Sequence, residues 1–431
     1  MLCHTRELGG GVVLHTVETN KFKTDCISVN FVMPLERETV TRVALLRGLL
    51  LRGSEGYPTF EKLSARTDEL YGADVSIETS AFGNLLVLSV TAVSLAGRYS
   101  VDGTDIIGGV CDLLRRICFF PVTENGGFSP EYTQSEKLRL KDEIEAKIND
   151  KGEYAGRRLG EIMYGDGYGG ISKLGYAEDL DGITATGAYL FYRGLVSRCP
   201  VHVYNVGGMT AEEAEYRVTT IFDGVERDCD GDIHAIRGHK RGVSVKRVAE
   251  EMDVKQGKLA IGYRTSAVLS DGRDYASMLV ANEIFGSSPV SKLFMHVREE
   301  LNLCYHCGSA YRAVNGAVTV AAGIDCTKLS IVLEAIEEML GEVQRGDFDD
   351  GELEIAKKSI VSGVRAGFDS ARYIISFFIA RELCGISDTP EALVARILDV
   401  SRDDVCRAAR ELSLDTVYFL CNDKKAAEEQ L

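Results

Sequence analysis

Two pairs of side chains, each spaced seven residues apart, have the residue types that could do chemistry. In SKLFMHVREELNLCY, Arg298 and Tyr305 supply a guanidinium and a phenol, which are donors that could stabilise charge on a carbonyl oxygen without a metal. Arg298 could equally form an ordinary surface ion pair with Glu299 on a helix. In EKLRLKDE, Glu136 and Glu143 lie two helical turns apart and share one face of a helix. That face could also simply be solvated.

The cysteines and histidines offer only weak motifs. Cys304 and Cys307 form C-x-x-C around His306, but no second pair with zinc-ribbon spacing follows, and the segment is typical of the start of a strand. Ordinary packing is preferred for this pair, and also for His234 and His239 in a polar stretch. No HExxH or HxxEH sequence occurs among the seven histidines, so neither form of zinc-peptidase motif is present.

Helices and hairpin-like strands must position these residues. The helix around 130–150 has Ser129 as a suitable N-cap and a core stripe of Leu140, Ile144 and Ile148. Strands are expected at VSIETSAF, NLLVLSVTAV, VHVYNVG, KLAIGYRT, GSAYRAV, GAVTVAAGI and DTVYFLCN. Further helices are expected around 39–52, 272–285, 289–301, 327–345 and 349–366. Hairpins combined with long helices favour an α+β fold.

The chain describes one kind of domain twice. An apolar helix ends at Gly53-Ser54, and a similar one ends 233 residues later at Gly286-Ser287; Tyr71 and Tyr305 precede equivalent strands 234 residues apart. Agreement over several elements indicates a duplication. We predict an N-terminal domain over 1–235, a polar linker over 236–256 and a C-terminal domain over 257–431.

Composition indicates a folded protein that does not wrap nucleic acid. Of 431 residues, 45% are hydrophobic and 26% charged, and the net charge of -16 argues against binding phosphates or anionic lipid. The acidic balance would suit a cationic peptide, or it serves solubility alone. The twelve cysteines are scattered behind an opening, MLCHTREL, that lacks an apolar signal core. These features predict a cytoplasmic protein with reduced thiols and no membrane span.

The order of motifs resembles the pitrilysin and insulinase superfamily of zinc peptidases, peptidase family M16, also called inverzincins. Members of this superfamily carry HxxEH on a helix that runs into a leucine-rich turn, and here the corresponding segment is RVALLRGLLLRGSEGYP. Matching Gly53-Ser54 and Tyr57-Pro58 to the family pattern puts Ala44 and Gly48 at the two histidines and Arg47 at the catalytic glutamate. The resemblance implies Glu143 as the third zinc ligand, with Glu136 as the other glutamate of that helix.

The same resemblance implies that Arg298 and Tyr305 contact the substrate backbone and the developing oxyanion. Alanine and glycine offer zinc no donor, and the protonated guanidinium of Arg47 cannot accept a proton from water. We therefore predict no catalytic residue, metal or cofactor in this chain, with zinc held by a partner subunit.

Within the superfamily the chain is most similar to the YfmF-type bacterial proteins, which resemble the non-catalytic subunits of processing peptidases. The fold implied is two tandem homologous domains of the LuxS/mitochondrial-processing-peptidase-like metallohydrolase type, together half of a clam-shell chamber. The function implied is an inactive subunit that binds peptide beside a zinc-bearing homologue, or in a homodimer. One alternative is a non-hydrolytic peptide-binding or scaffold protein linked to modification of elongation factor P. Another is an active zinc peptidase with an unrecognised site.

Overall fold

The computed structural model describes residues 2–229, 231, 233–238 and 244–431, so His239 lies outside the described part. The chain divides into two compact units, each built from separate stretches of sequence. The first unit comprises 1–145, 172–235 and 368–383, and the second comprises 146–171, 236–367 and 384–431. No helix in the described part is long and apolar enough to cross a membrane.

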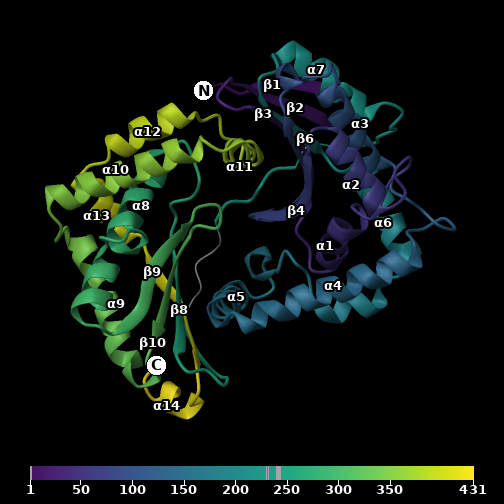
Figure 1. Cartoon of the computed structure of the whole chain (residues 1–431). Helices are drawn as coiled ribbons and strands as arrows, with labels where there is room; N and C mark the ends of the chain where they lie inside the picture. Colours follow the sequence, from purple (N-terminus) through teal and green to yellow (C-terminus); the bar gives the residue numbers. More distant parts are fainter. Residues whose placement is uncertain (1, 230, 232, 239–243) are drawn as a thin grey trace. The chain divides into compact units, whose positions relative to one another are not determined.

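The first unit is built on a six-stranded sheet with the order β1-β2-β6-β3-β5-β4 (Figure 1). Its strands are β1 (His4–Gly9), β2 (Val12–Glu18), β3 (Thr24–Pro34), β4 (Asp74–Phe82), β5 (Leu85–Leu95) and β6 (Val201–Gly207). The β2 and β6 strands run parallel, and all the other neighbours are antiparallel.

The second unit is built on a five-stranded sheet with the order β7-β11-β8-β10-β9. Its strands are β7 (Lys246–Glu251), β8 (Gly257–Arg264), β9 (Cys304–Arg312), β10 (Ala317–Ile324) and β11 (Ser413–Cys421). Here β7 and β11 are the parallel pair. The β7 strand lies inside the segment expected to be a linker.

The two sheets repeat one topology, which confirms the expected pair of homologous α+β domains. Apart from the additional β1, the order β2-β6-β3-β5-β4 corresponds strand by strand to β7-β11-β8-β10-β9. The helices α1 (Val40–Leu49) and α8 (Arg273–Asn282) begin 233 residues apart, as do α2 (Phe60–Glu69) and the π-helix η6 (Leu293–Glu300). The longer helices that follow the hairpins also correspond, α3 (Ile106–Phe119) to α9 (Leu329–Arg345) and α4 (Pro130–Asn149) to α10 (Asp350–Gly367).

The remaining α-helices pack on helices already named or on strands. The α-helices are α6 (Ala185–Arg198), α7 (Ala211–Thr219), α12 (Pro390–Leu398), α13 (Arg402–Arg410) and α14 (Lys424–Glu428). A second π-helix, η5 (Glu283–Ser287), continues α8 directly. Short 3₁₀ turns are η1 (Gly97–Tyr99), η2 (Tyr168–Gly170), η3 (Ala177–Gly182), η4 (Thr220–Phe222) and η7 (Cys326–Lys328).

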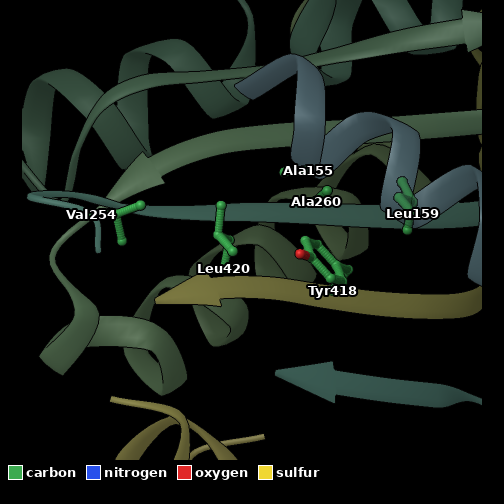
Figure 2. Packing of buried hydrophobic residues seen from close by; sticks show 6 residues of the cluster. All are labelled: Ala155, Leu159, Val254, Ala260, Tyr418 and Leu420. Atoms are coloured by element: carbon green, nitrogen blue, oxygen red, sulfur yellow. The ribbon is translucent and has the colours of Figure 1, made fainter. Parts of the chain in front are cut away.

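The next pair of equivalent helices, α5 (Lys151–Tyr164) and α11 (Ala371–Leu383), is exchanged between the units. The α5 helix precedes every strand of the second sheet in sequence, yet it packs on β8 and β11. Figure 2 shows Ala155 and Leu159 of α5 beside Ala260, Tyr418 and other buried residues of that unit. The approach is so close that a Cβ added to Gly262 would lie 2.7 Å from the sulfur of Met163.

The α11 helix makes the reciprocal contribution to the first unit, where it packs on β6 and β3. Phe31 of β3 contacts Phe119 of α3 with ring centroids 5.9 Å apart, whereas Ser28 and Asn30 line a pocket with Ile375 of α11. Because successive strand residues point to opposite faces, α3 and α11 cover opposite faces of the first sheet.

The core stripe predicted for α4 is only partly correct. Leu140 is buried, but Ile144 is half-buried and Ile148 is 37% exposed. Steps of four residues rotate about 40° beyond a full turn each time, so such a stripe drifts off the buried face. The buried face instead contains Thr133, Glu136 and Leu140.

Candidate functional site

The helices α1 and α4 bring the positions of the degenerate zinc site together. Ala44 and Gly48 are buried in α1, an apolar helix with most of its side chains in the core. Arg47 extends from the same helix toward α4, where its Nη2 donates to Glu143 Oε2 at 2.8 Å. Its Nε also donates to the backbone oxygen of Ala44 at 3.2 Å. The position of the catalytic glutamate is therefore filled by a cation bound to the expected third ligand.

Glu136, the other glutamate of α4, is 4% exposed, so the solvated-face alternative does not describe it. Arg52 Nε donates to its Oε1 at 2.6 Å, and Arg139 Nε donates to its Oε2 at 2.7 Å. A Cβ added to Gly48 would overlap the Glu136 carboxylate. The space that a histidine side chain would need at residue 48 is thus occupied by this carboxylate.

The residues present at this site do not fit a catalytic zinc ion. Positions 44, 47 and 48 provide no lone-pair side-chain donor, whereas zinc sites need several nitrogen, oxygen or sulfur ligands. Both carboxylates already have guanidinium partners, so their charge is balanced by side chains. Activation of a water molecule would also need a base, and a guanidinium cannot serve as one.

In the second unit, Tyr305 is presented by a β-bulge in β9. His306 pairs with Gly323 and Cys304 pairs with Ile324, which leaves Tyr305 as the extra residue. A bulge redirects a side chain from the regular alternation of a strand. Tyr305 is 85% exposed, so its phenol is accessible to a ligand.

Arg298, on η6, has the ordinary surroundings of a helix surface residue. Its Nε lies 3.5 Å from Glu299 Oε1, and its guanidinium lies 4.5 Å from the centroid of the Phe294 ring. The side chain is 39% exposed. Arg298 therefore makes the contact with Glu299 that is expected of an ordinary surface residue on a helix. Part of its guanidinium nevertheless remains accessible.

Cys304 and Cys307 of β9 are joined by a side-chain hydrogen bond. Both are buried, and a hydrogen bond from Cys307 lowers the pKa of Cys304, with Arg298 contributing to the same shift. The same hydrogen bond and burial raise the pKa of Cys307. None of the twelve cysteines, all of which lie in the described part of the chain, forms a disulfide. The pair fits the expected packing role.

Sequence reasoning missed a polar pocket on the face of the first sheet that α11 covers. The pocket has a volume of about 170 Å³. On its floor, the Ser28 and Thr91 hydroxyls lie 2.8 Å apart. At its rim, Arg372 of α11 donates to Ser76 Oγ at 3.0 Å and to Asp74 Oδ2 at 3.1 Å. Alternating hydroxyl residues in ISVN, VSIETS and LSVT were the available signal.

Several known proteins resemble this chain. Residues 191–360 match the family described as Peptidase M16 inactive domain. The chain is 32% identical over 412 residues to the probable inactive metalloprotease YmfF of Bacillus subtilis, with 95% of this chain and 96% of that protein covered. The relative is named YmfF, which corrects the type name YfmF given for the resemblance. An uncharacterized zinc protease of Streptomyces coelicolor is 25% identical over 287 residues, covering 64% of this chain and 61% of that protein.

Solved structures share the fold over nearly the whole chain. A conserved protein from Enterococcus faecalis V583 has a TM-score of 0.90 and 28% identity, covering 98% of this chain and 99% of that one. The peptidase M16 inactive domain from Pseudomonas fluorescens has a TM-score of 0.79 at 17% identity, covering 98% of this chain and 99% of that one. The latter likeness shows the fold alone.

Proposed function

Because the chain belongs to the M16 peptidase family as an inactive metalloprotease homologue, we propose that it binds peptide and completes the chamber of a zinc-bearing homologous partner. The partner supplies the zinc ion and the water-activating glutamate. The observation that carries this proposal is the ion pair of Arg47 with Glu143, which puts a fixed cation where catalysis needs a base. We also propose a cytoplasmic location, since twelve cysteines without a disulfide suit a reducing compartment.

The contribution of this chain to the shared site would be donors for the peptide. Tyr305 presents its phenol from the bulge, and Arg298 retains accessible guanidinium surface. Both groups can donate to a peptide carbonyl, and preorganised donors of this kind stabilise negative charge that develops on the carbonyl oxygen. The polar pocket beneath α11 offers hydroxyls that suit peptide amides.

The test is co-expression with a zinc-bearing homologue, followed by purification of the complex and assay of peptide hydrolysis. We expect Arg298→Ala and Tyr305→Phe each to lower kcat/KM of the complex about 100-fold, the loss typical of one oxyanion donor. Arg345→Ala is the matched control, because Arg345 is an exposed arginine of the same unit paired with Glu338 and Asp347. Unchanged hydrolysis in both test variants would refute the shared site.

Two other outcomes favour the alternative functions. Recovery of self-dimers alone, with no zinc-bearing homologue and no hydrolysis, would support a peptide-binding or scaffold protein, for which modification of elongation factor P is the context to examine. Chelator-sensitive hydrolysis by this chain alone would mean an active peptidase and would overturn the proposal.

A further inference from the structure

Two buried histidines meet on the face of the first sheet that α11 covers. His15 of β2 is 1% exposed and His202 of β6 is 7% exposed. The parallel register aligns His15 with Tyr204 and Val13 with His202, so both imidazoles lie on one face, and His15 Nε2 is 3.0 Å from His202 Nδ1. Neither histidine belongs to the degenerate site on α1 and α4.

Glu382 of α11 adds a carboxylate to this pair. One ligand atom from each of His15, His202 and Glu382 can be chosen so that all three lie within 4.8 Å of one another. Two nitrogens bound to zinc at tetrahedral geometry, with bonds of about 2.0–2.1 Å, are separated by about 3.3 Å. The observed separation of 3.0 Å between the two nitrogens is close to that value, so a shared ion would require little movement of the rings.

The surroundings prepare His15 to act as a ligand. His15 Nδ1 lies 3.3 Å from the hydroxyl of Thr5 on β1, and a hydrogen bond from Nδ1 to a neighbouring oxygen fixes the tautomer whose Nε2 is a lone-pair donor. That neutral tautomer is the form of imidazole that binds metals.

Tyr204 provides an independent sign that this cluster is incomplete. Its ring stacks on His15 with centroids 4.4 Å apart and planes at 11°. Its hydroxyl is fully buried and has no hydrogen-bond partner among the described residues. Buried polar atoms without a partner are rare in folded proteins, and an ion or its bound water is one explanation.

We propose that His15, His202 and Glu382 bind a divalent transition metal ion, with Zn²⁺ the best match to two imidazoles and one carboxylate. The ion would link α11 to β2 and β6 within the first unit. Its role would be structural, because it joins a helix from the second repeat of the sequence to the sheet formed by the first.

The first experiment measures zinc binding by the full chain after chelator treatment. ZnCl₂ is titrated in competition with a chromophoric chelator, and metal content is measured by mass spectrometry. We expect one zinc ion per chain and at least a 100-fold weaker affinity in His15→Gln and Glu382→Gln, since loss of outer-shell partners alone costs 10–100-fold. His296→Gln is the matched control, because His296 is a partly exposed histidine paired with Glu300.

The second experiment separates ligation from a general folding defect. Amide hydrogen exchange across residues 371–383 should slow when Zn²⁺ is added to the unsubstituted chain and should not respond in Glu382→Gln. Circular dichroism of each metal-free variant establishes that it is folded. Equal zinc affinity in the unsubstituted chain and in Glu382→Gln, or no bound zinc at micromolar concentration, would mean that the histidines form only a hydrogen bond in the core.

Discussion

At the residue scale, the degenerate site contains two carboxylates whose negative charge is balanced by arginine side chains. Glu143 is held by Arg47, and Glu136 by Arg52 and Arg139. Removing one partner of a buried ion pair costs more than the pair contributes, because the remaining charge is left without compensation. The arginines are therefore part of the stability of this region, not only replacements for catalytic groups.

Residue 48 should have to be glycine, because the Glu136 carboxylate occupies the space where a Cβ atom would lie. We expect Gly48→Ala to destabilise the protein by about 1–3 kcal/mol, because the new methyl group would displace the buried carboxylate. Urea unfolding followed by circular dichroism measures the effect. Gly156→Ala is the control, since Gly156 also lies within a helix and has open space around its Cβ position. That control should gain about 0.5–1 kcal/mol, and an equal gain in Gly48→Ala would contradict the packing described.

At the element scale, α13 begins with a capping box whose acid also binds two arginines. Asp404 accepts from the Ser401 backbone N–H at 2.9 Å and from Arg273 of α8 at 2.5 Å. Arg407 adds a further hydrogen bond. These contacts, with the hydrogen bond from Arg273 the largest, hold the pKa of Asp404 below its usual range. The acid thereby fastens α13 to α8.

The stabilisation from Asp404 should depend on pH. Because the folded pKa is depressed, the stabilisation is present above the unfolded value of about 3.9 and is lost as the pH falls below it. We expect Asp404→Asn to cost about 1.5–3 kcal/mol at pH 7, the range for hydrogen bonds to charged groups. The difference from the unsubstituted chain should narrow below about pH 4. Asp350→Asn, at an exposed acid paired with Arg402, is the control, and a pH-independent gap would contradict this assignment.

The α5 helix should stabilise the second sheet although it comes from the first half of the sequence. Leu159 is buried among Ala260, Tyr418 and Leu420. We expect Leu159→Ala to cost about 2–5 kcal/mol, as for other buried leucines. Hydrogen exchange should report lost protection in β8 and β11. Leu190→Ala, at a leucine that is 64% exposed, should change stability by less than about 0.5 kcal/mol, and a similar loss in both variants would argue against the packing of α5.

The sequence predicts α1, α4, α8, α9 and α10 and the hairpin strands, because their periodicity is local, but it misses other helices, among them α3, α5 and α11. It did not reveal β3, which has Ser28 and Asn30 on one face and is covered there by a helix more than three hundred residues later in the chain. Local pattern likewise could not pair Arg47 with Glu143, or show that Glu136 fills the space beside Gly48, because both depend on how α1 and α4 pack. The family resemblance identified the positions of the site. The contacts that these residues make became apparent only from the packing of the helices.

At the scale of the whole molecule, the exchange of α5 and α11 determines what can fold alone. A fragment of residues 1–235 has the first sheet without α11, and a fragment of 236–431 has the second sheet without α5. Each would expose apolar surface that the full chain buries. The two repeats of the sequence are therefore not the two units of the structure.

We expect each fragment expressed separately to aggregate or to bind a hydrophobic dye, and the two fragments expressed together to co-purify as a one-to-one complex. Thermal unfolding of that complex, compared with the intact chain, measures how far the native fold is restored. Independent cooperative unfolding of either fragment alone, without dye binding, would show that the exchanged helices are dispensable.

The helix exchange also has a consequence for how such a chain could lose its catalytic residues and persist. It is equivalent to a domain swap in which the two copies have become one polypeptide. A single repeat would need a second copy to cover its sheet, so the smallest folding assembly contains two. The first repeat cannot be discarded when its zinc ligands are lost, because the sheet of the second unit still depends on α5.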